Sequence, residues 1–122
     1  MPMTLLELYV GVVGVLMLVA SVEQTFLTRF IARASIWGHA PGWQREIAFW
    51  NVAMVTVIGG VLWTRDATAA RIATAAIVVL TVFLGTNHLL AFRSQRQGWV
   101  HRVGAIVNYA GAVTGTAALL LA

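Results

Sequence analysis

The chain has 122 residues, of which 60% are hydrophobic and 10% are charged, with a formal net charge of +4 and a mean hydropathy of +0.84. A soluble domain carries roughly 25% charged residues, so this composition excludes a water-soluble globular domain. The basic residues are all arginines and occur singly or in pairs beside apolar segments, which excludes the basic stripe of a nucleic-acid-binding protein. Cysteine is absent, so thiol catalysis and cysteine-ligated metal or iron–sulfur sites are also excluded.

Four long apolar segments, separated by short polar connections, make up most of the chain. Crossing the hydrocarbon core of a bilayer takes about 20 mostly apolar residues, so four crossings leave room only for short connections. The pattern predicts an all-α, polytopic membrane protein in which residues 1–122 form one four-helix transmembrane domain. We expect the helices at about residues 8–27, 47–63, 69–92 and 103–121.

The first predicted helix follows a start without a positively charged region or a cleavage site, so we expect a retained helix and not a signal peptide. Glu23 falls late in this helix. A pair with Arg29 or Gln24 at the membrane surface is its plainest interpretation, and the coupling carboxylate of a small proton-coupled transporter is the alternative. In size, helix count and a first-helix Glu the chain resembles the small multidrug-resistance transporters. Glu23, however, lies near the end of its helix and not at mid-membrane.

The longest predicted connection covers residues 32–45. Its Gly38, Pro41 and Gly42 are expected to break any helix there. Trp37 and Trp43 are expected to anchor the connection at the membrane surface, since indole rings favour the headgroup zone. The sequence therefore predicts an irregular surface segment between the first two crossings.

The third and fourth predicted helices carry their polar residues near the connection that joins them. Asn87 and His88 fall late in the third helix, and His101 and Asn108 fall early in the fourth. Three glycines share one face of the fourth helix with His101 and Asn108. Small residues at such spacing let helix backbones approach closely. We expect these glycines to serve helix packing: Gly104, Gly111 and Gly115.

The distribution of arginines predicts the orientation in the membrane. Six of them flank the first and third connections, and only Arg65 and Arg71 lie on the opposite side. Because cytoplasmic connections carry an excess of basic residues, we expect a multi-pass protein of the cell (inner) membrane with both termini outside. The six are Arg29, Arg33, Arg45, Arg93, Arg96 and Arg102.

This topology places eight polar side chains at similar depth, in or beside the cytoplasmic half of the bilayer. Ionisable groups at such depth tend to pair or to face a wet cavity. At about 100° per residue, the eight do not converge on one point. The candidate polar site is Glu46, Asn51, Asn87 and His88, with Glu23, Asn108 and His101 as weaker candidates and Gln24 as the eighth member.

Part of the chain resembles a bacterial family of small four-helix membrane proteins of unknown function. The similarity rests on Trp43-Gln44-Arg45-Glu46, with Asn51 five residues later and Gly59-Gly60 further along the helix, and on Gly85-Thr86-Asn87-His88. It covers roughly residues 30–92, about half of the chain. The resemblance implies the four-helix fold and draws attention to Glu46, Asn51 and His88, but it implies no activity.

His88 together with Glu46 is the sharpest functional hypothesis. An imidazole and a carboxylate are ligands for a metal such as zinc or iron, and they also relay protons or position a quinone or another lipid-soluble substrate. The plainer interpretation pairs Glu46 with Arg45, Arg93 or a helix N-terminus, while His88 hydrogen-bonds a neighbouring helix. The sequence leaves the identity of any cofactor or metal open.

Three functions follow from these alternatives. The leading hypothesis is a non-catalytic accessory or scaffold subunit in the bilayer, either a homo-oligomer or part of a larger membrane complex. The second is a membrane-embedded redox protein or an enzyme acting on a lipid-soluble substrate, and the third is a small proton-coupled transporter. Whether the chain is an enzyme stays open, and no nucleic-acid partner is expected.

Overall fold

The computed structural model describes residues 4–95 and 98–122, and over this part of the chain it is all-α. Four of its helices are long and apolar enough to cross a membrane, which confirms the predicted fold class. Residues 1–3 and Arg96, which entered the prediction of a retained first helix and of the orientation, lie outside the described residues. The helices are α1 (Leu5–Phe26), α2 (Thr28–Arg33), α3 (Pro41–Thr64), α4 (Ala67–Gln95) and α5 (Trp99–Leu121).

All four long helices begin earlier than the apolar pattern predicts, and at α1 and α4 the reason is a polar residue that caps the first turn. At the start of α1 the backbone N–H of Glu7 donates to Thr4 Oγ1 (3.2 Å), and the backbone N–H of Thr4 donates to Glu7 Oε2 (2.7 Å). This reciprocal pair is a capping box. At the start of α4 the backbone N–H of Ala69 donates to Asp66 Oδ1 (2.6 Å). Polar capping residues therefore extend both helices beyond their apolar cores.

The prediction of an irregular segment over residues 32–45 was wrong at both of its ends. A short helix, α2, runs up to Arg33, and α3 already begins at Pro41. Proline is favoured at the first position of a helix, since its missing N–H would have no partner there and its φ is already helical. Pro41 thus starts a helix in which Gly42 and Trp43 take part, and only residues 34–40 remain irregular.

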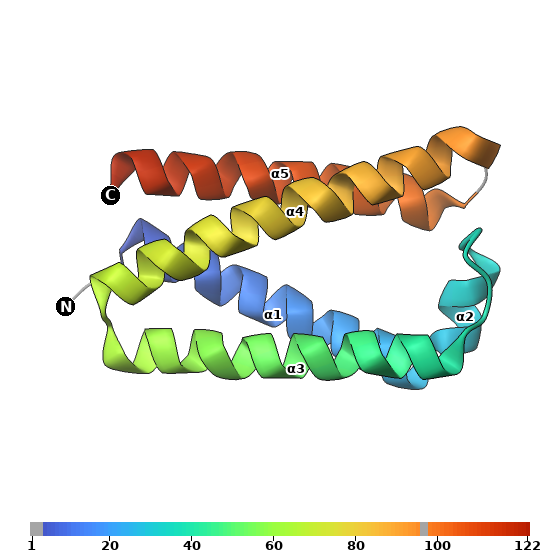
Figure 1. Ribbon diagram of the computed structural model, residues 1–122, viewed down its shortest axis with the longest axis horizontal. Coiled ribbons are helices and arrows are strands. Elements are labelled where there is room, and N and C mark those ends of the chain that lie inside the picture. Colours follow the sequence, from blue (N-terminus) through green and yellow to red (C-terminus); the bar gives the residue numbers. More distant parts are fainter. Residues whose placement is uncertain (1–3, 96–97) are drawn as a thin grey trace.

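The four spanning helices pack as two antiparallel pairs, α1 with α3 and α4 with α5 (Figure 1). The two pairs meet at the end of the molecule where the chain termini lie, and they diverge toward the other end, where α2 and the irregular segment are found (Figure 1). Hereafter these are the terminal end and the connection end of the bundle.

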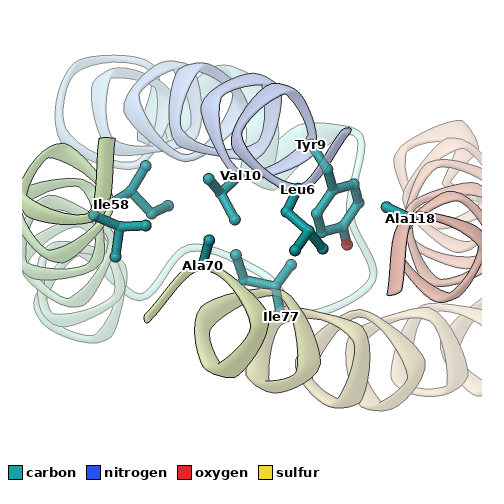
Figure 2. Close-up of a cluster of buried hydrophobic side chains, with 8 residues drawn as sticks. Leu6, Tyr9, Val10, Ile58, Ala70, Ile77 and Ala118 are labelled. Atoms are coloured by element: carbon teal, nitrogen blue, oxygen red, sulfur yellow. The ribbon is translucent and has the colours of Figure 1, made fainter. Parts of the chain in front are cut away.

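The apolar core fills the terminal end. Figure 2 shows side chains of all four spanning helices turned toward one another there. Ile77 of α4 and Val10 of α1 are completely or almost completely buried in it, and Ile58 of α3 packs in the same cluster. The full cluster is Leu6, Tyr9, Val10, Ile58, Val61, Ala70, Ile77 and Ala118.

An ion pair supports the same end. Arg65 ends α3 in the left-handed conformation (φ 53°), and its guanidinium donates from Nε to Glu7 Oε1 (2.9 Å) and from Nη2 to Glu7 Oε2 (3.1 Å). The hydrogen bonds with the Glu7 carboxylate raise the pKa of Arg65 above its ordinary value. The turn between α3 and α4 is therefore fastened to the first turn of α1.

Candidate functional site

Two histidines from different helices meet near the connection end of the bundle. His88 of α4 and His101 of α5 lie with their Nδ1 atoms 3.2 Å apart, at hydrogen-bond distance. A glycine makes this approach possible. A Cβ atom at Gly104 would lie 2.7 Å from two atoms of the His88 ring, so the ring lies against the bare backbone of α5. Any side chain at position 104 would displace His88.

His101 is fully buried and also holds the irregular segment. Its Nε2 accepts a hydrogen bond from the backbone N–H of Ile36 (3.0 Å) and lies 3.1 Å from Ser35 Oγ. Ser35 Oγ in turn accepts a hydrogen bond from the backbone N–H of Trp37 (3.1 Å). One imidazole on α5 thereby fixes three consecutive residues of the connection between α2 and α3.

These hydrogen bonds determine where the protons lie on the two neutral rings. His101 Nε2 is an acceptor for the Ile36 N–H, so the neutral ring carries its proton on Nδ1. That Nδ1–H must then donate to Nδ1 of His88, which leaves the proton of His88 on Nε2. His88 Nε2 has no hydrogen bond with a described residue. The chain of bonds thus ends in one imidazole N–H that is available to an acceptor.

Trp37 lies beside both imidazoles. Its ring centroid is 4.4 Å from that of His101, in an edge-to-face arrangement, and 5.0 Å from that of His88. The indole itself is 53% exposed. The pair is therefore shielded on one side by an aromatic ring that is itself half-exposed.

Gly98 allows the irregular segment to reach the histidines. It has a positive φ of 83°, and a Cβ there would lie 2.8 Å from the carbonyl oxygen of Ala34 and 3.1 Å from Cδ2 of His101. Both the backbone conformation and the lack of space require glycine at this position. The segment consequently packs directly on the start of α5.

The remaining polar residues singled out by sequence do not join the histidine pair. Glu46 is exposed on α3 and forms no hydrogen bond or ion pair with a described residue, so the structure does not bring it to His88. Asn51 and Glu23 are partly exposed and Asn87 is exposed. Asn108 Nδ2 donates to the carbonyl of Gly104 in its own helix (2.8 Å).

A metal site gains no support from the described residues. Within 4–95 and 98–122, no group of three histidine or carboxylate side chains is placed to hold a metal ion. The hypothesis that Glu46 and His88 bind a metal together stays a prediction, since no contact joins these two side chains in the described part of the chain. The described arrangement is that of the plainer interpretation for His88, a hydrogen bond to a neighbouring helix.

The glycines of α5 lie against other helices of the same chain. A Cβ at Gly115 would lie 2.6 Å from Tyr9 of α1 and 2.6 Å from Val78 of α4, and one at Gly111 would lie 3.5 Å from Thr81. With Gly104 against His88, all three glycines face neighbours inside the bundle. They let α5 approach α4 along much of its length.

Sequence reasoning missed two members of the site, Ser35 and Trp37. Trp37 was interpreted only as a surface anchor, and Ser35 was not considered. Both lie in the irregular segment, whose path is set by contacts with α5 that have no periodicity in the sequence. The available signal was Gly98, since a glycine just before a helix that carries a buried histidine indicates close backbone approach.

Comparison of the chain with protein-family models, with curated proteins and with solved structures gave no match. What the fold and site define is therefore a class: an all-α protein with four membrane-spanning helices and a histidine pair between α4 and α5. The similarity of residues 43–53 and 85–88 to a bacterial membrane-protein family stays a prediction.

Proposed function

We propose that this chain is a non-catalytic accessory or scaffold subunit of a bacterial inner membrane, and that it acts by associating with other transmembrane helices. The observation that carries the proposal is the position of Asn87. This side chain is exposed on α4, within a membrane-spanning segment, and makes no hydrogen bond with a described residue.

The depth of Asn87 makes its exposure costly for an isolated chain. It lies five residues before Phe92, where the apolar run of α4 ends ahead of Arg93, and at a rise of 1.5 Å per residue this is about 7.5 Å inside that run. An amide facing lipid there has no hydrogen-bond partner, whereas a bond to a neighbouring helix contributes about 0.6–2 kcal/mol. A second transmembrane helix against this face of α4 would satisfy it.

Two glycines of α3 support the same proposal. No atom of the described residues lies within 4 Å of a Cβ built at Gly59 or Gly60, whereas Gly104 and Gly115 face close neighbours. Glycine inside a helix costs about 0.5–1 kcal/mol relative to alanine, and residues 4–95 and 98–122 offer no close packing at 59 and 60 that would offset this cost. Small exposed residues at that point suit the close approach of a helix from another subunit.

The orientation is part of the proposal. Both termini lie at the terminal end of the bundle (Figure 1), opposite the connections that carry six of the eight arginines. The excess of arginines on those connections favours a cytoplasmic connection end and external termini.

Association is tested by native mass measurement of the chain extracted in mild detergent, together with cross-linking in intact membranes. We expect the wild-type chain to be recovered as an oligomer or with a partner, and Asn87→Leu to lower that fraction severalfold. Thr114→Val is the matched control, since Thr114 is also exposed on a spanning helix but donates to its own backbone at Ala110 (2.9 Å). A wild-type chain that is monomeric and uncross-linked in membranes would contradict the proposal.

A second candidate function, an enzyme or redox component that handles a lipid-soluble substrate, is favoured by one observation. The Nε2–H of His88 has no acceptor among the described residues, and it lies beside the half-exposed ring of Trp37. A carbonyl oxygen of a flat, lipid-soluble molecule such as a quinone suits this pair. Stoichiometric quinone in the purified protein that is lost in His88→Ala and kept in His39→Ala would favour this function over the scaffold.

A further inference from the structure

A concave, basic surface lies beside α2 at the connection end and belongs to neither proposed function. One shallow depression of about 300 Å³ is lined by Arg29, Ala32, Arg33 and His39. A second, of about 360 Å³, adjoins it across Arg33 and is lined also by Phe30 and Trp99. We call the two together the α2 cradle: Arg29, Phe30, Ala32, Arg33, Ala34, His39, Gly98 and Trp99.

The cationic groups of the α2 cradle have no counter-charge within the described chain. Arg29 and Arg33 are exposed and form no ion pair or hydrogen bond with a described residue. They lie four residues apart on α2, so both project from the same side of the helix. His39 is held beside them, because its Nε2 lies 3.3 Å from Oγ1 of Thr28 at the start of the same helix.

We propose that the α2 cradle binds the phosphate of an anionic phospholipid. Two guanidinium groups supply several N–H donors in the fork geometry that fits phosphate oxygens. The lining contains no carboxylate, so the ammonium group of a zwitterionic headgroup finds no partner there. A headgroup with a net negative charge leaves no such cation unpaired.

The surroundings of the cradle match the remainder of a lipid molecule. Phe30 and Trp99 are largely exposed beside Arg33. Indole rings favour the zone between headgroups and acyl chains, and Trp99 is the first residue of the membrane-spanning helix α5. The phosphate thus lies over α2 while the glycerol and upper acyl chains lie along Phe30 and Trp99.

The test is lipid retention measured by native mass spectrometry of the full chain, titrated in detergent with phosphatidylglycerol or with phosphatidylcholine. We expect the wild type to prefer phosphatidylglycerol. The double variant Arg29→Gln with Arg33→Gln removes two basic residues. From the usual contribution of each basic residue near an anionic surface, we expect this variant to bind phosphatidylglycerol about thirtyfold more weakly. Arg29→Lys with Arg33→Lys should keep part of the affinity, because the charge remains and the fork is lost.

The matched control is Arg93→Gln with Arg102→Gln, which removes the same charge from exposed positions of α4 and α5 outside the cradle. We expect this variant to keep the preference of the wild type. An equal loss in both double variants, or equal retention of the two lipids by the wild type, would overturn the site. Displacement of the lipid by millimolar inorganic phosphate would show that the cradle takes free phosphate and would overturn the assignment to a lipid.

Discussion

The two ends of this four-helix bundle are held together by different forces. At the terminal end, eight buried apolar residues from all four spanning helices interdigitate (Figure 2), and an Arg65–Glu7 ion pair closes the turn beside them. At the connection end the helix pairs diverge (Figure 1), and they are joined there by His101 of α5, whose Nε2 accepts a hydrogen bond from the N–H of Ile36 and lies at hydrogen-bond distance from Ser35 Oγ. We infer that apolar packing at the terminal end contributes most of the stability of the bundle. The connection end depends instead on a few directional hydrogen bonds to one histidine ring.

The largest expected effect comes from adding one methyl group at the terminal end. Gly115→Ala places a Cβ 2.6 Å from Tyr9 and Val78, so the helices must move apart, and we expect a loss of about 2–3 kcal/mol of stability. Gly42→Ala in α3 is the matched control, because no described atom lies within 4 Å of a Cβ there, and its higher helix propensity should add up to about 1 kcal/mol. Thermal unfolding in detergent, followed by circular dichroism, measures both. Equal melting temperatures for the two variants would mean that the close packing around Gly115 does not hold the helices together.

The next effect concerns the ion pair. Glu7→Gln keeps the shape of the side chain but removes the charge that faces Arg65, and it weakens the acceptor of the capping box. We expect a lower melting temperature than in the wild type, with a smaller decrease than in Gly115→Ala. Asp66→Asn is the control, since Asp66 caps α4 without contacting Arg65 in the described hydrogen bonds. If Glu7→Gln is as stable as the wild type, the ion pair adds nothing to stability, and apolar packing alone stabilises the terminal end.

The smallest effect on global stability is expected at the connection end. His101→Ala leaves the N–H of Ile36 without its acceptor, which costs about 1–3 kcal/mol when the donor stays buried. The irregular segment escapes most of this cost by detaching into water. The expected result is therefore a modest change in melting temperature and a large increase in tryptic cleavage at Arg33, which directly precedes the segment.

His39→Ala serves as the control for that experiment, because its ring contacts Thr28 and not the histidine pair. It should leave the cleavage rate of the wild type nearly unchanged. Unaltered cleavage in His101→Ala would show that the segment is held by contacts other than its hydrogen bonds to this ring.

Much of the fold could be predicted because it depends on local composition. A long apolar run such as 69–92 is stable in a bilayer only as a helix. The number of spans and their helical structure therefore follow from the sequence. The starts of α1 and α3 could not be found from hydropathy, because Thr4, Glu7 and Pro41 act through capping and backbone geometry. Neither property changes the apolar content of a window.

The candidate site was predicted only as far as single helix faces allow. His88 and His101 were both named, yet Glu46 was paired with His88 and the structure places it elsewhere, exposed on α3. The rotation of α3 about its axis is set by its packing with α1, where Ala48 and Ile58 are buried. The sequence predicts how deep a residue of α3 lies in the membrane, but this depth does not determine which way its side chain faces around the helix axis.

The even number of spanning helices has a consequence for engineering this chain. Four crossings return the last residue to the end where the first described residues lie (Figure 1). A second copy can therefore follow Ala122 through a short flexible linker without an added crossing. Such tandem fusions would fix the protomer ratio genetically, so that Asn87→Leu in one half reveals how many copies need their amide for assembly.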